Sequence, residues 1–364
     1  MKTIVHVTEA LGGGVCSLLS SITNLQARSS RIILIYSVRP SSPSARELRR
    51  LFPEPIELIR VSMVTNISVG KDIASLISLV SIFKKINPTV IHLHSSKAGA
   101  LGRAAARIAG MSDKVFYSPH GLSFLRLDIS KSKRRLYRLL EWFASKTGGV
   151  ILASSESEGE IIRRELRSKT VRCIANGVDF SSIKISKGTG NDKMRVITTG
   201  RITYAKAPWK FKEIVTATEN SEVNFVWAGD GELRDSIFPC NEVIPNLHIT
   251  GWVENGTLVL DELARSDIFL LTSLWEGMPI SLLEAQAAGL PAVVSNTVGS
   301  RDVVLNGVTG YICDSADEMI EKIQTLVNDS GLRASMGAAA SKRAIELFSI
   351  NRMHSELLEV YGIE

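Results

Sequence analysis

The stretch that decides the fold lies in the second half of the chain and reads IFLLTSLWEGMPISLLEAQAAGLPAVVS over residues 268–295. It begins with a short apolar run, Ile268–Leu271, and ends with a second one, Ala292–Ser295, both of which predict buried strands. Ile280–Ala288, between them, predicts a helix. A strand, a helix and a second strand in this order are typical of a parallel sheet covered by helices.

The same order recurs along the rest of the chain. Strands are predicted at Thr3–Val7, Ile32–Tyr36, Val90–His94, Val115–Ser118, Val150–Ser154, Arg195–Gly200 and Val223–Ala228, and helices at Cys16–Leu25, Leu76–Lys85, Ala98–Ala109, Trp209–Thr218, Ser315–Val327 and Leu332–Leu358. Ser181–Met194 has little apolar content and predicts a linker. Periodicity therefore predicts two doubly wound α/β domains, 1–180 and 181–345. Ligands of such folds bind at the carboxyl ends of the strands, so we expect a site in a cleft between the domains.

Composition restricts the class of protein. The chain has 364 residues, of which 45% are hydrophobic and 22% charged, and this excludes a disordered or collagen-like protein. Its four cysteines lie far apart without a C-x-x-C motif, which argues against disulfides and zinc clusters and for reduced thiols. No apolar run approaches the roughly 18 residues of a membrane span, and the first residues are too short for a signal peptide. We therefore expect a cytoplasmic protein.

Charge is distributed unevenly. Residues 1–180 contain 27 basic and 13 acidic side chains, whereas residues 181–364 contain 16 and 24. This imbalance predicts an anionic partner for the first half: nucleic acid, a membrane surface or a phosphorylated substrate. Aromatic residues make up 6% of the chain and do not alternate with the basic ones, so we expect no nucleic acid.

Three consecutive glycines, Gly12–Gly14, follow the first predicted strand and precede a helix. Glycines at this position let the backbone approach a phosphate, and the helix N-terminus supplies N–H donors. The alternative is a tight turn without a ligand. The stretch is not a full G-x-G-x-x-G, and no acidic residue about 20 positions on completes a dinucleotide fingerprint.

Two carboxylates, Glu276 and Glu284, flank the start of the helix in the 268–295 stretch. Paired acids serve acid–base chemistry, as in glycoside hydrolysis, or accept hydrogen bonds from hydroxyls. The apolar neighbours Leu282, Leu283 and Ala285 predict that the helix is buried on most sides.

The region from Ser273 to Ser295 resembles the E-x7-E region of family 4 glycosyltransferases with the GT-B fold, and the chain is similar to bacterial capsule and O-antigen enzymes that use lipid-linked oligosaccharides. The resemblance covers nearly the whole chain. It includes SPHG at 118–121, IANGVD at 174–179, Gly200-Arg201 with Lys206, and WAGDGEL at 227–233. Ala207 stands where the family usually has a glycine, and Pro208 follows it, so the turn that holds Lys206 is expected to tilt.

This resemblance implies a retaining hexosyl- or N-acetylhexosaminyltransferase that needs no metal or other cofactor. It would move a sugar from a nucleotide diphosphate, with UDP the more frequent in the family, to a hydroxyl of a polyprenyl-diphosphate-linked glycan. The first domain would bind the acceptor and the second the donor, with a C-terminal helix, 346–364, crossing back to the first. The alternatives are a sugar-nucleotide epimerase of the same fold and a non-enzymatic membrane- or nucleic-acid-binding protein.

The resemblance also implies roles for individual residues. Arg201 and Lys206 would neutralise the diphosphate, where negative charge grows in the transition state. Glu284 would accept hydrogen bonds from the ribose and Glu276 from the transferred sugar, while His120 would contact that sugar. Further donor contacts are expected from Gly13, Gly14, Val253, Gly277, Met278, Pro279 and Ile280.

His92 and His94 alternate on a predicted strand and therefore point to one face. Two histidines at this spacing can bind a metal. With no third ligand evident and no Asp-x-Asp motif, we expect no metal site.

Residues Arg126–Lys146 combine seven basic side chains with leucines and aromatic residues at helical spacing. Such a helix either lies on an anionic membrane or packs its apolar stripe on the sheet and leaves the basic face in solvent. The excess of positive charge in the first half favours the membrane, and so predicts peripheral attachment to the inner face of the cytoplasmic membrane.

Overall fold

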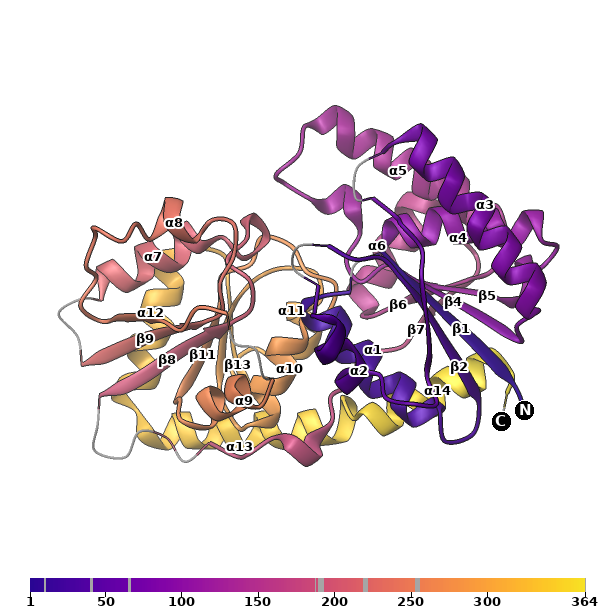
Figure 1. Cartoon of the computed structure of the whole chain (residues 1–364). Coiled ribbons are helices and arrows are strands. Elements are labelled where there is room, and N and C mark those ends of the chain that lie inside the picture. Colours follow the sequence, from indigo (N-terminus) through magenta and orange to yellow (C-terminus); the bar gives the residue numbers. More distant parts are fainter. Residues whose placement is uncertain are drawn as a thin grey trace. The chain divides into compact units, whose positions relative to one another are not determined.

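The computed structural model of the chain describes residues 1–9, 11–39, 42–64, 67–186, 188, 193–218, 222–252 and 256–363. These residues form two compact units, Met1–Asn176 with Ile350–Glu364, and Gly177–Ser349. The boundaries between the units lie at 176/177 and 349/350, a few residues from the limits 180/181 and 345/346 that we expected. Each unit is a parallel sheet with helices packed on it (Figure 1).

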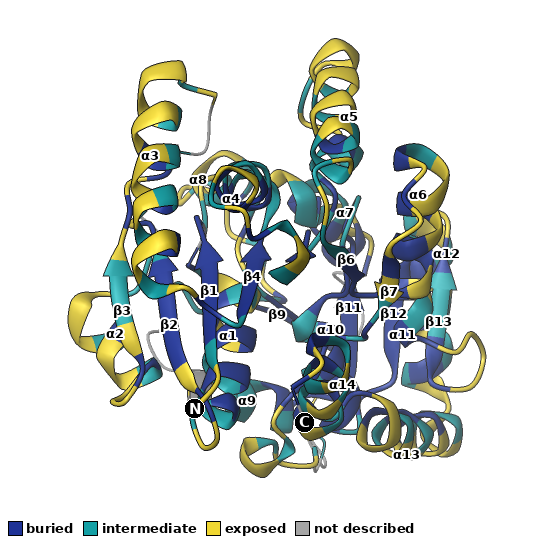
Figure 2. Cartoon of the chain, turned by 90° about the vertical axis from the view of Figure 1, so that its right-hand side faces the viewer, coloured by how far each residue is buried: buried dark blue, intermediate teal, exposed yellow. Residues whose placement is uncertain are grey.

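The first unit has a seven-stranded sheet in the order β3-β2-β1-β4-β5-β6-β7. Its strands are β1 (Thr3–Thr8), β2 (Arg31–Tyr36), β3 (Glu57–Arg60), β4 (Val90–His94), β5 (Val115–Ser118), β6 (Val150–Ala153) and β7 (Val171–Cys173). Its helices are α1 (Gly13–Gln26), α2 (Ala45–Leu51), α3 (Val69–Ile86), α4 (Ser96–Ile108), α5 (Lys131–Ser145), α6 (Glu156–Leu166) and α14 (Ile350–Tyr361). Helices α3, α4 and α5 lie on one face of the sheet, and α1 and α14 on the other (Figures 1 and 2).

The second unit has a six-stranded sheet in the order β10-β9-β8-β11-β12-β13. Its strands are β8 (Met194–Thr199), β9 (Val223–Ala228), β10 (Leu247–Ile249), β11 (Ile268–Leu271), β12 (Ala292–Ser295) and β13 (Gly310–Cys313). Its helices are α7 (Pro208–Ala217), α8 (Arg234–Ile237), α9 (Gly256–Ala264), α10 (Ile280–Ala287), α11 (Ser300–Val303), α12 (Ala316–Asn328) and α13 (Ser330–Leu347). A core of Phe211, Phe225 and Trp227 joins α7 to the sheet, with the Phe211 and Trp227 rings 4.8 Å apart.

Strand order locates the ligand-binding edge in both sheets. The direction of winding reverses between β1 and β4 in the first sheet and between β8 and β11 in the second. The loops that follow such strands diverge to opposite faces and leave a crevice at the carboxyl ends. Gly13 and Gly14 follow β1, Arg201 and Lys206 follow β8, and Glu276 follows β11, whereas His120 follows β5, the strand beside β4.

The structure corrects two of the expected helices. The single helix expected at Leu332–Leu358 is two helices, because α13 ends at Leu347 and α14 begins at Ile350. At this break the Val178 N–H donates to the Phe348 carbonyl at 2.8 Å. Helix α1 begins at Gly13 rather than Cys16, so Gly13 and Gly14 belong to its first turn.

Candidate active site

An ion pair marks the crevice of the second unit. Lys206, in the 3-10 turn Tyr204–Lys206 after β8, places Nζ 2.8 Å from Oε1 of Glu276, which follows β11. Each side chain is 16% exposed, so both reach solvent from a largely enclosed position. The Ser273 hydroxyl donates to the same Glu276 oxygen at 2.7 Å. Glu276 is therefore fixed in one orientation beside a cation.

Hydrogen bonds to backbone carbonyls tie the two loops of this site together. The Thr272 hydroxyl donates to the Lys206 carbonyl at 2.7 Å, and the Leu274 N–H donates to the Ala205 carbonyl at 2.8 Å. Ala207 then adopts the left-handed conformation, φ +46°, and is fully buried. A glycine fits this conformation with less strain, and Pro208 at the first position of α7 accounts for the abrupt turn.

The turn that carries Arg201 is packed closely against the next loop of the sheet. Gly200 has φ +124°, and a Cβ on Gly229 would lie 2.2 Å from the Gly200 carbonyl oxygen. The Trp227 indole donates to that same oxygen at 2.9 Å. Arg201 itself is exposed, so its guanidinium is available to a ligand at the crevice.

Glu284 lies in the second turn of α10 and is half-buried. Burial raises the pKa of its carboxyl to about 7, so the neutral and ionised forms are close in free energy at physiological pH. Gly277, Met278 and Pro279 are buried in the loop that leads into this helix, and Ile280 is half-buried at its start. Val253, the remaining donor contact we expected, lies outside the described residues.

The crevice of the first unit is lined by a helix N-terminus and a strand-end histidine. Gly13 and Gly14 are exposed in the first turn of α1, where backbone N–H groups have no partner within the helix. His120 follows β5 with φ +53°, and the next residue, Gly121, donates its N–H to Oε1 of Glu158 at 3.0 Å. Burial lowers the pKa of His120 to about 4, so its ring is neutral near pH 7.

A cluster of histidines lies behind His120. The third histidine that we did not find in the sequence is His6, which is paired with His92 in the register of β1 and β4. His6, His92 and His94 are buried, and one ring nitrogen of each lies within 4.8 Å of the others. Both nitrogens of every ring are already hydrogen-bonded: His6 to Gln26 and His94, His92 to Ser118 and Tyr361, and His94 to His6 and His120. A metal here would have to displace one of these bonds.

Helix α5 buries one acidic side chain and exposes most of its large apolar side chains. Its one buried side chain among Lys131–Ser145 is Glu141, which accepts from Arg103 at 2.7 Å and from the Tyr117 hydroxyl at 2.8 Å. The apolar stripe on the other side is exposed, as Figure 2 shows for the helix as a whole. Exposed fractions are 44% for Leu136, 52% for Leu139, 44% for Leu140 and 62% for Phe143. The alternative that this stripe packs on the sheet is therefore wrong.

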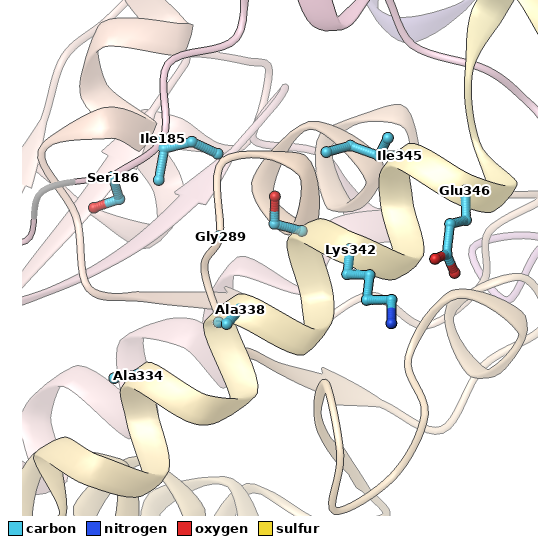
Figure 3. Close-up of a pocket in the computed structure, with 10 residues that line it drawn as sticks. Ile185, Ser186, Gly289, Ala334, Ala338, Lys342, Ile345 and Glu346 are labelled. Atoms are coloured by element: carbon cyan, nitrogen blue, oxygen red, sulfur yellow. The ribbon is translucent and has the colours of Figure 1, made fainter.

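A cavity of about 670 Å³ lies elsewhere, along α13 (Figure 3). Ile185, Gly289 and Ile345 line it, with Lys342 and Glu346 on the helix beside them. Gly289 precedes β12, so the cavity is at the amino end of that strand, whereas ligands of parallel sheets bind at the carboxyl end. It is not part of the candidate site.

Among the described residues, none of the helices combines the length and the apolar character needed to cross a bilayer.

Comparison with known proteins agrees with this fold. Residues 11–182 match the model described as Glycosyltransferase Family 4, and residues 179–343 match Glycosyl transferases group 1. The chain is 32% identical over 322 residues, 82% of each chain, to the UDP-Gal:alpha-D-GlcNAc-diphosphoundecaprenol alpha-1,3-galactosyltransferase of Escherichia coli. It is 27% identical over 346 residues, 88% of each chain, to the Capsular polysaccharide biosynthesis glycosyltransferase CapM of Staphylococcus aureus.

A solved structure of Anabaena Alr3699/HepE, in complex with UDP and glucose, superposes with a TM-score of 0.78 at 17% identity, covering 100% of both chains. Two parallel α/β sheets of this topology define the GT-B class of glycosyltransferases. The chain belongs to glycosyltransferase family 4, whose second domain is the group 1 glycosyltransferase domain, and it is an enzyme of that class.

Sequence reasoning missed the residues that support the site. Ser273 and Thr272 directly follow a predicted strand, and that position was their only signal. His6 was missed because only the pairing of β1 with β4 brings it to His92 and His94.

Proposed function

We propose that the chain transfers a sugar from a UDP-sugar to a hydroxyl of a polyprenyl-diphosphate-linked glycan, with retention of anomeric configuration and without a metal, in surface polysaccharide synthesis. The observation that carries the proposal is the Lys206–Glu276 pair, at 2.8 Å, where the second sheet reverses its winding. It places a cation suited to a diphosphate directly beside a carboxylate suited to sugar hydroxyls.

Lys206 and Arg201 would bind the diphosphate and stabilise the charge that it gains as the glycosidic bond breaks. A diphosphate at Lys206 would bring the attached sugar next to Glu276, whose carboxylate would accept from its hydroxyls. Glu284 would accept from the ribose hydroxyls. These two cations would take the place of a metal ion at the leaving group.

In the first unit, the N–H groups of Gly13 and Gly14 are proposed to contact phosphate, and His120 the transferred sugar. No side chain at the described crevices is proposed as a nucleophile. Retention would then follow from attack by the acceptor hydroxyl on the face from which the diphosphate leaves, with that diphosphate taking the proton.

The acceptor is proposed from two observations. The name of the Escherichia coli relative specifies a UDP-sugar and a diphosphoundecaprenol-linked acceptor. Helix α5 exposes Leu136, Leu139, Leu140 and Phe143 among basic residues, and such a face suits an anionic membrane that holds a polyprenyl lipid. Each Lys or Arg near anionic headgroups contributes about 1 kcal/mol. We propose that α5 docks the enzyme on the inner leaflet.

One experiment tests the reaction. Purified enzyme is incubated with UDP- and GDP-sugars and a polyprenyl-diphosphate-linked N-acetylhexosamine, with and without EDTA, and the product linkage is read by NMR. We expect a new glycoside with the donor's anomeric configuration, from a UDP-sugar, at equal rates in EDTA. Conversion of the nucleotide sugar to its isomer without an acceptor would identify the alternative, an epimerase, and an inverted product would overturn retention.

A further inference from the structure

A chain of hydrogen bonds connects the interior of the first unit to His120. Gln26 Oε1 lies 2.8 Å from His6 Nε2, His6 Nδ1 lies 2.9 Å from His94 Nε2, and His94 Nδ1 lies 2.9 Å from His120 Nε2. Gln26, His6 and His94 are buried, at 0%, 0% and 2% exposure, while His120 is half-buried at the crevice. This hydrogen-bond chain therefore begins in the core and ends at the ligand-binding edge.

We propose that Gln26, His6 and His94 are positioning residues that fix which ring nitrogen of His120 carries the proton. The inference rests on the proposed function, in which His120 contacts the transferred sugar. It gives a role to three buried polar residues that contact neither the donor nor the acceptor in the proposed function.

The direction of the chain follows from counting protons. A neutral imidazole has one N–H, so each ring that donates at one nitrogen must accept at the other. Because the Gln26 oxygen accepts from His6 Nε2–H, His6 Nδ1 must accept from His94 Nε2–H. His94 Nδ1 in turn accepts from His120 Nε2–H. The Nδ1 atom of His120 is then left with a lone pair, which can accept a hydrogen bond from a sugar hydroxyl.

The environment keeps one proton on each ring. Burial lowers the pKa of His6 and of His120 to about 4, and lowers that of His94 well below its usual value, where the neighbouring histidines add to the effect. A second proton on His6 or on His94 would put two donors face to face. With each ring neutral, the hydrogen bonds from Gln26 to His120 all run in one direction, and the acceptor oxygen of Gln26 sets that direction.

His92 provides a matched control. It is buried in the same strand two residues before His94, and its ring centroid is 4.0 Å from that of His94. Its own nitrogens, however, bond to Ser118 at 2.9 Å and to the Tyr361 hydroxyl at 2.6 Å, outside the chain. Replacing it changes the packing of the cluster without cutting the connection from Gln26 to His120.

The test is long-range ¹H–¹⁵N NMR of the whole protein labelled with ¹⁵N at histidine. The protein has six histidines to assign. At pH 7 without substrate, we expect His120 to carry its proton on Nε2. The proton should stay there in Gln26→Glu, whose carboxylate still accepts, and in His92→Gln. In Gln26→Leu we expect a mixture of both tautomers and a roughly tenfold lower kcat, with the KM for the donor unchanged.

A His120 proton on Nδ1 in the unchanged protein would overturn the proposal, as would a fixed Nε2 tautomer in folded Gln26→Leu. A metal bound stoichiometrically at the cluster would overturn it as well. Because the tautomer is read without turnover, its outcome is independent of whether the protein transfers a sugar. If His120 has the expected tautomer but the proposed transfer does not occur, the role of His120 is rejected and the hydrogen-bond chain from Gln26 to His120 still stands.

Discussion

At the scale of single residues, Lys206 already pairs with Glu276 and would also bind the diphosphate of the donor. Replacing Lys206 or Arg201 with Ala should remove a charge-assisted hydrogen bond worth about 1.5–3 kcal/mol. We expect kcat/KM to fall roughly ten- to a hundredfold, measured as initial rates against donor concentration. The melting temperature should hardly change.

Lys212→Ala is the matched control for this loss of charge. Lys212 forms an ion pair with Glu242 at 2.6 Å in the same unit, on α7 and away from the crevice. Its removal should leave kcat/KM unchanged. Unaltered turnover in both Lys206→Ala and Arg201→Ala would reject the diphosphate assignment.

Variants of the two glutamates should differ in their affinity for UDP. Glu284→Gln should weaken binding of free UDP, because the ribose is common to donor and product, whereas Glu276→Gln should spare UDP binding and damage sugar transfer. Calorimetry with UDP on both variants measures this. An equal loss of affinity in the two would contradict the roles we propose.

The raised pKa of Glu284 adds a dependence on pH. The ionised carboxylate accepts more hydrogen bonds than the neutral acid, so binding should tighten as pH rises through about 7. If only the ionised form binds, affinity should increase about tenfold between pH 6 and 8. UDP-glucose is the probe, because its diphosphate does not titrate in this range. Glu284→Gln should bind with the same affinity at both pH values.

At the scale of elements, α5 is the one whose orientation could not be predicted from its sequence. Periodicity indicated an amphipathic helix but left open which side faces the protein. The structure decides this through Glu141, whose bonds to Arg103 and Tyr117 join residues more than 20 positions apart in the sequence. By contrast, the strands of the 268–295 stretch were predicted to the residue, because continuous apolar runs specify buried parallel strands on their own.

The exposed face of α5 should bind anionic lipid. We expect the protein to sediment with vesicles containing anionic lipid at low salt and to be released at high salt. Changing Lys131, Lys133 and Arg135 together to Gln should weaken sedimentation. Arg134 is kept, because its Nε donates to the Phe124 carbonyl at 3.0 Å and supports the loop before the helix.

A triple change of Lys71, Lys84 and Lys85 to Gln removes the same charge from exposed positions on α3 and should leave sedimentation intact. Equal binding to neutral and anionic vesicles would contradict an electrostatic attachment. Equal loss in the two triple variants would assign the attachment to net charge rather than to α5.

At the scale of the whole molecule, the buried histidines predict sensitivity to acid. His6 titrates near 4 in the folded chain and near 6.5 when unfolded, so the unfolded state gains protons first as pH falls. Stability should therefore be complete above pH 6.5 and decline toward pH 4, by about 3 kcal/mol for His6 alone. Urea unfolding at a series of pH values measures it. His6→Gln should flatten the decline, and replacing the exposed His248 should not.

The two sheets followed from the sequence because their strands alternate regularly with helices. The strands β3, β7, β10 and β13 at or near the sheet edges were not predicted, since they have three or four residues and partly exposed side chains that resemble loops. Most residues expected at the crevices follow the strands at which winding reverses, and His120 follows β5, the strand beside β4. The supporting shell of Ser273, Thr272 and His6 depends on contacts between distant segments, which periodicity does not encode.

The path of the chain has a consequence for synthesis. The second unit, Gly177–Ser349, is continuous, and all its strands are synthesised before α14. The first unit is not, because α14 packs against α1 and its Tyr361 hydroxyl bonds to His92 of β4. The strands of the first sheet are therefore synthesised early, but the helix that covers them follows only after the whole second unit, so we expect the first unit to reach its native state after the second.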